Sequence, residues 1–137
     1  MRTPLLAAAT CLAVTGYVHA DLYVEGYRAI AVIGPAFLAQ ASASLAVAGL
    51  LVAAVRWPDG LPILRCAAGA LAAGALAGFA ASRTVGVFGF VERGLQPAPQ
   101  ALISVLSEVG VLLLLGVDWL SRRRAAGRVP AARASRV

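Results

Sequence analysis

Four apolar stretches, each close to twenty residues long, constrain the fold of this chain more than any other feature. A helix needs about 20 residues to cross the ~30 Å hydrocarbon core of a bilayer. Each stretch begins at a proline, which suits the first turn of a helix because its missing N–H would have no partner there. The stretches are residues 4–20, 35–55, 62–82 and 99–120. They predict an all-α fold, a bundle of four transmembrane helices within residues 1–121.

The composition supports a membrane protein. Of the 137 residues, 61% are hydrophobic and only 13% are charged. A soluble domain of this size exposes too much of its surface to hide so many apolar side chains. Half of the arginines lie after residue 121, so the net charge of +6 belongs mostly to the tail. We therefore expect the lipid bilayer, and no nucleic acid, as a partner, and a disordered, basic cytoplasmic tail at residues 122–137.

The distribution of arginines predicts the orientation. With the N-terminus inside, the inner segments carry nine arginines and the outer segments carry three. Positive charge favours the cytoplasmic side, so both termini are expected there, in a multi-pass protein of the plasma membrane. The start of the chain also fits a signal peptide cleaved after Ala20. Because the apolar run is long and includes Gly16, Tyr17 and His19, we favour a retained helix, and the cleaved form stays an alternative.

Polar and aromatic side chains follow the first apolar stretch, at the expected outer mouth of the bundle. If the first helix continues past Ala20, His19 and Tyr23 share one of its faces. Asp21 and Glu25 then share another. One imidazole and two carboxylates can form part of a divalent metal site, but the chain has a single histidine. We therefore expect no metal and no other cofactor.

The two outer connections also carry balanced charges. Their charged residues are Asp21, Glu25, Arg28, Arg83, Glu92 and Arg93. We expect a salt-bridge network between the connections, and because exposed ion pairs contribute little energy, it would mainly fix geometry. Residues 84–94 are rich in glycine and phenylalanine but too short to span a membrane. They are expected to lie over the outer mouth as a lid.

Glu108 is the most conspicuous ionisable residue within an apolar stretch. A charged group in the middle of a membrane is costly and often functional. Gln100, Ser104 and Ser107 lie at helical spacing from Glu108, which predicts a polar stripe that faces the bundle interior. Glu108 needs a partner or a proton, and the candidate partners are His19 and Arg83. It is either a structural clasp between helices or a ligand or proton site.

Smaller polar and small-residue patterns mark the two middle helices. Gln40 is a polar residue in the second apolar stretch. In the third stretch, small residues recur every four positions, at Ala70, Gly74, Gly78 and Ser82. Such spacing lets helix backbones approach closely in lipid. We expect this face to pack against another helix, in the same chain or in a second copy.

Four local patterns crowd the predicted outer mouth. They are His19-x-Asp21-Leu22-Tyr23, Gly26-Tyr27-Arg28-x-Ile30, Ile33-Gly34-Pro35-x-Phe37-Leu38-x-Gln40 and Thr84-Val85-Gly86-x-Phe88-Gly89-Phe90-x-Glu92. Together they resemble a group of small four-helix integral membrane proteins from actinobacteria, over about residues 15–110. A weaker likeness, of architecture alone, is to DoxX-type proteins. The resemblance implies a four-helix membrane bundle and implies no activity.

Three classes of function follow from these patterns. The first is a non-enzymatic accessory or interaction subunit of the plasma membrane, with other membrane proteins or a second copy as its partner. The second is a small transporter or ligand-binding protein with a polar site at the outer mouth. The third is a quinone- or redox-linked membrane enzyme, although no catalytic residue can be assigned. The candidate polar cluster comprises His19, Asp21, Tyr23, Glu25, Arg28, Gln40, Arg83, Glu92 and Glu108.

Overall fold

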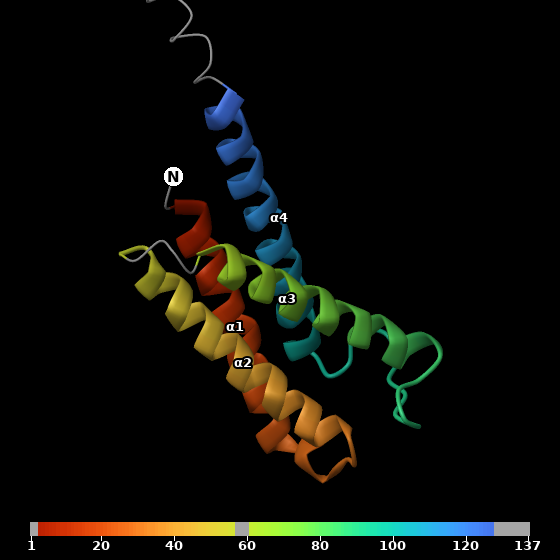
Figure 1. Ribbon diagram of the computed structural model, residues 1–137. Coiled ribbons are helices and arrows are strands. Elements are labelled where there is room, and N and C mark those ends of the chain that lie inside the picture. Colours follow the sequence, from red (N-terminus) through yellow and green to blue (C-terminus); the bar gives the residue numbers. More distant parts are fainter. Residues whose placement is uncertain (1–2, 57–60, 128–137) are drawn as a thin grey trace, which may run out of the picture.

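The computed structural model describes residues 3–56 and 61–127, and this part of the chain is helical with no β-strand. The elements are α1 Thr3–Glu25, the short 3₁₀ helix η1 Tyr27–Ala29, α2 Ile33–Ala54, α3 Leu61–Thr84 and α4 Gln100–Gly127 (Figure 1). All four α-helices are long and apolar enough to cross a membrane. The prediction of an all-α fold with four helices long and apolar enough to span a membrane is confirmed.

The prolines mark the helix starts, as predicted. Pro4, Pro35 and Pro62 lie in the first turns of α1, α2 and α3. Pro99 directly precedes α4, and its carbonyl accepts a hydrogen bond from the N–H of Ile103 in the first turn of that helix at 3.1 Å. At these positions the chain has no N–H to leave unpaired.

Two helices extend farther than predicted. α1 continues past Ala20 to Glu25. α4 continues to Gly127, so the expectation of a disordered tail from residue 122 is wrong for residues 122–127. Within this last stretch Arg122 pairs with Asp118 at 3.1 Å, and Arg123 lies 3.9 Å above the Trp119 ring. Such pairs, one helical turn apart, favour continuation of the helix. Residues 128–137 lie outside the described part of the chain.

The helices form a ring in which α1 lies between α2 and α4, and α3 closes the other side. α1 makes its most extensive contacts with α2 and α4, whereas α3 contacts α2 and α4 less extensively. Figure 1 shows α1 and α2 side by side and α3 running at an angle to them. We call the end with residues 26–32 and 85–99 the outer end, after the predicted orientation, and the opposite end the inner end.

The two halves of the bundle are packed differently. The inner half holds a tight apolar core from all four helices, comprising Leu5, Ala9, Leu12, Ala48, Leu51, Ala68, Ala72 and Val111. α1 and α2 approach closely at Gly16, where an added Cβ would lie 3.0 Å from the Leu45 side chain. The outer half, in contrast, encloses a cavity.

Candidate functional site

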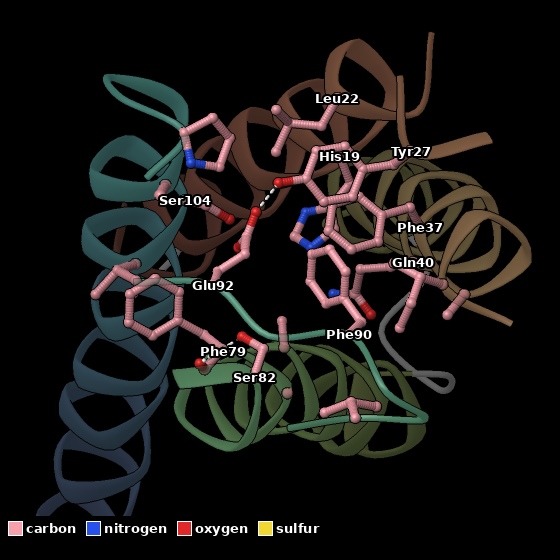
Figure 2. Close-up of a pocket in the computed structure, with 18 of the residues that line it drawn as sticks. His19, Leu22, Tyr27, Phe37, Gln40, Phe79, Ser82, Phe90, Glu92 and Ser104 are labelled. Atoms are coloured by element: carbon pink, nitrogen blue, oxygen red, sulfur yellow. Dashed lines mark hydrogen bonds between the residues drawn. The ribbon is translucent and has the colours of Figure 1, made fainter. Parts of the chain in front are cut away.

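A cavity of about 220 Å³ lies in the outer half of the bundle. All four helices and both outer connections contribute to its wall (Figure 2). The residues that bear on its chemistry are His19, Tyr27, Phe37, Gln40, Gly78, Phe79, Arg83, Phe90, Glu92, Ser104 and Glu108. This volume is slightly below the ~300 Å³ at which drug-sized ligand pockets begin, so it suits a small organic molecule.

Glycines of α3 leave the space that forms the cavity. Gly74 and Gly78 line it, and a Cβ built on either residue meets no atom within 4 Å. Within this chain, therefore, these two members of the small-residue stripe face the cavity, and the expectation of close helix packing is not met there. Ser82, one turn further along α3, lines the same wall.

Glu108 lies at the base of the cavity and is 1% exposed. Its Oε1 accepts hydrogen bonds from Thr15 of α1 at 2.8 Å and from Ser104 of α4 at 2.7 Å. Within residues 3–56 and 61–127, the structure gives Oε2 no donor. Glu108 is therefore a clasp between α1 and α4 through one oxygen, while the other oxygen is left for whatever occupies the cavity.

His19 lies beside this clasp. Its Nδ1 is 2.9 Å from the carbonyl oxygen of Thr15. Because a carbonyl only accepts, Nδ1 carries the proton in this contact, and the neutral ring then has Nε2 as an acceptor. The ring centroids of His19 and Phe37 are 5.0 Å apart. His19 and Arg83, the two predicted partners of Glu108, do not bond to it directly, and the direct partners are hydroxyl groups.

Aromatic rings form much of the remaining wall. The ring centroids of Tyr27 and Phe37 are 4.6 Å apart and stacked, and Phe90 meets Tyr27 edge-on at 5.6 Å. Phe90 comes from the 85–99 connection, where a turn joins the bridged residues Val87 and Phe90. The predicted lid segment thus contributes side chains to the outer wall of the cavity (Figure 2).

Tyr27, Arg83 and Glu92 form an outer latch that joins the two connections. The Tyr27 hydroxyl donates to Oε1 of Glu92 (Figure 2). Nη2 of Arg83 lies 2.9 Å from Oε2 of the same carboxylate. Arg83 also donates from Nε to the Gly94 carbonyl at 2.7 Å. Burial, followed by the hydrogen bond to the Glu92 carboxylate, raises the pKa of Tyr27 above its ordinary value of 10.0. Tyr27 therefore stays a neutral donor at neutral pH.

The structure brings five of the nine predicted site residues together at the cavity. They are His19, Gln40, Arg83, Glu92 and Glu108. Asp21 and Glu25 instead face α4, where Nε2 of Gln100 lies 3.5 Å and 3.4 Å from their carboxylates. Tyr23 and Arg28 do not line the cavity.

In the part of the chain that the structure describes, the expected salt-bridge network between the two outer connections does not form: its one ion pair joins Arg83, in the last turn of α3, to Glu92 of the 85–99 connection that follows it. Among the described residues, Arg83 pairs with Glu92, while Arg28 and Arg93 pair with no carboxylate. Asp21 and Glu25 are held on the α4 side of the bundle, away from Arg83. In residues 3–56 and 61–127, no three His, Cys, Asp or Glu side chains are grouped as metal ligands.

The sequence did not reveal two contributors to the site, Thr15 and Tyr27, or a buried carboxylate away from it, Asp118. Thr15 lies one turn before His19, and this i, i+4 spacing was the available signal. Tyr27 was placed only at the outer interface, because its Glu92 partner is 65 residues away. Asp118, 1% exposed, lies ten residues after Glu108 on α4 and pairs with Arg65 of α3 at 2.9 Å. Because Asp118 lies near the end of the fourth apolar stretch, its position in the sequence did not indicate that it is buried.

Fold and site together define a multi-pass helical membrane protein whose four-helix bundle is packed at one end and hollow at the other. No protein-family model, curated protein or solved structure matches this sequence. The resemblance to actinobacterial four-helix proteins, and the weaker one to DoxX-type proteins, therefore stays a prediction.

Proposed function

We propose that this protein binds a small organic molecule in the cavity of its outer half. One observation carries the proposal: a cavity of about 220 Å³, built by all four helices, ends at a buried carboxylate whose Oε2 has no donor among the described residues. A group that only clasped two helices would not need an open space beside it. The apolar and aromatic wall suits the body of a ligand, and the buried polar groups suit one polar end.

The cavity favours the ligand-binding class over the accessory-subunit class, because an accessory subunit needs no cavity. In the proposed orientation, both termini are cytoplasmic and the outer latch faces the outside of the plasma membrane.

The test is to fill the cavity from its glycine wall. Gly78→Leu places a large side chain in the cavity, whereas Gly116→Leu adds the same side chain on α4 at a position with open space outside the cavity. The melting temperature of the purified protein is measured with a panel of small amines, alcohols, carboxylic acids and quinones. A ligand at 100 times its Kd stabilises the folded state by about 2.7 kcal/mol.

We expect at least one compound to raise the melting temperature of the wild type and of Gly116→Leu, but not that of Gly78→Leu. The proposal fails if no compound acts on the wild type. It also fails if the same compound stabilises Gly78→Leu equally, since binding would then occur outside the cavity.

A further inference from the structure

Hydrogen-bond donors and acceptors are unequally available on the cavity wall. Side-chain donors are already engaged by the protein. Ser104 donates to Glu108, Tyr27 donates to Glu92, and Ser82 donates to the Phe79 carbonyl at 2.9 Å. Every guanidinium nitrogen of Arg83 also has an acceptor, which leaves no free cation at the cavity among the described residues.

In the Gln40 amide, too, the donor group is engaged by the protein and the acceptor is not. Its Nε2 donates to the Leu71 carbonyl at 3.2 Å and lies 3.4 Å from the Ser44 hydroxyl. Its Oε1 receives no donor from the described residues. The acceptors left at the cavity are therefore Glu108 Oε2, His19 Nε2 and Gln40 Oε1.

The two carboxyl groups at the cavity also differ in whether a cation of the protein pairs with them. Arg83 offsets the charge of Glu92 in the outer latch. Among the described residues no salt bridge reaches Glu108, because its direct partners are the hydroxyls of Thr15 and Ser104. A buried carboxyl group needs either a proton or a cation beside it, and a charge-assisted hydrogen bond from a cation matches its ionised form.

We propose that the ligand is an organic ammonium ion with N–H donors and a small apolar or aromatic body. The ammonium group donates to Oε2 of Glu108, and its body lies against Phe37, Phe79 and Phe90. This inference rests on the proposed binding function and specifies the ligand class for the same cavity.

The test compares two molecules of nearly equal shape, 2-phenylethylammonium and neutral 2-phenylethanol. Binding is measured by equilibrium dialysis against the full chain in lipid nanodiscs at pH 7, with empty nanodiscs as the blank for partition into lipid. Glu108→Gln removes the charge and keeps an oxygen for Thr15 and Ser104. Glu25→Gln removes the same charge from an exposed position outside the cavity.

We expect the wild type and Glu25→Gln to bind the ammonium ion at least about tenfold more tightly than the alcohol, a difference of about 1.4 kcal/mol. Glu108→Gln should reduce this ratio to about one. If Glu108→Gln does not fold, the ratio in the wild type still decides whether the cavity selects a cation.

Three results would overturn the inference, and they differ in their cause. Equal binding of both molecules by the wild type, abolished in Gly78→Leu, refutes the cation and leaves the proposed function standing. Selectivity that persists in Glu108→Gln shows that another group recognises the cation. If the wild type retains neither molecule beyond the blank, and no other compound of the wider panel is stabilising, the cavity is not a binding site and both proposals fail.

Discussion

Glu108 illustrates how neutral neighbours can hold an ionisable residue in a membrane helix. Thr15 is fully buried and its hydroxyl donates to Glu108 across the α1–α4 interface. Ser104 donates to the same oxygen from within α4. Two hydroxyls thus satisfy one carboxylate oxygen without an ion pair, and the other oxygen remains available for a ligand.

The clasp makes a prediction for Thr15→Val, which replaces the hydroxyl by a methyl group of similar size. Glu108 loses one of its two donors, so we expect the free energy of unfolding to fall by about 1–3 kcal/mol. The measurement is equilibrium unfolding in mixed detergent micelles. Thr10→Val is the matched control, because the Thr10 hydroxyl bonds only to the Leu6 carbonyl of its own helix at 3.1 Å. Equal effects of the two variants would contradict an interhelical role for Thr15.

The outer latch makes a prediction about pH. The pKa of Tyr27 is raised in the folded protein above 10.0, so the folded state keeps this proton when the unfolded chain has begun to lose it. The stabilisation from Tyr27 is therefore complete below pH 10 and declines as the pH rises from 10 towards the folded pKa. We expect the stability difference between the wild type and Tyr27→Phe to be constant from pH 7 to 9 and to narrow above pH 10. A difference that grows above pH 10 would show that tyrosinate, rather than the neutral hydroxyl, is favoured in the fold.

At the scale of the elements, the start of α2 packs closely against the connection that precedes it. Gly34 lies inside α2, with its N–H bonded to the Ile30 carbonyl at 2.9 Å. An added Cβ there would lie 2.8 Å from the carbonyl oxygens of Tyr27 and Arg28, a contact with backbone that cannot move aside easily. Only glycine, which has no Cβ, fits this space. The close approach holds the backbone of Tyr27 against the start of α2, and Tyr27 lines the cavity.

Gly34→Ala should therefore destabilise the protein, by about 1–3 kcal/mol, because overpacking forces the backbone to shift. Gly49→Ala is the control on the same helix, where an added Cβ meets nothing within 4 Å. It should be neutral or stabilising by up to about 1 kcal/mol, since alanine favours a helix over glycine. Both values come from unfolding in mixed micelles. Similar stabilities for the two variants would mean that the connection is not tight at Gly34.

At the scale of the whole molecule, the bundle combines a packed inner half with a hollow outer half. The inner core contains Leu12 and Leu51, both fully buried. In the outer half, α3 contributes Gly74 and Gly78 to the cavity wall, where an added Cβ meets no atom within 4 Å. As a whole, α3 contacts its neighbours less extensively than α1 does.

The orientation across the membrane can be tested with single cysteines. In a background with Cys11→Ala and Cys66→Ala, Val85→Cys introduces a thiol at a position that is 87% exposed at the outer end. Arg124→Cys introduces one in the last turn of α4. We expect a membrane-impermeant maleimide to label Val85→Cys in intact cells and Arg124→Cys only after permeabilisation. The reverse pattern would overturn the proposed orientation.

The sequence by itself determined the elements of this protein. The length and apolarity of a stretch, and the position of its proline, are properties of that stretch alone. They therefore predicted four helices long and apolar enough to span a membrane, with starts within two residues of those observed. The outer-mouth candidates His19, Arg83 and Glu92 were found for the same reason, since polar groups in an apolar chain stand out. The extension of α4 was missed because the charges that suggested a tail instead pair along the helix, as Arg122 does with Asp118.

Only the tertiary structure decided which groups meet. Thr15 and Glu108 are 93 residues apart, and Tyr27 and Glu92 are 65 apart. Such pairs depend on how each helix is rotated and tilted in the ring, which hydropathy does not specify because lipid accepts any apolar face. The cavity likewise depends on how α3 packs. The small-residue stripe of α3 predicts close packing, whereas in the structure Gly74 and Gly78 line a cavity that also reaches Glu108.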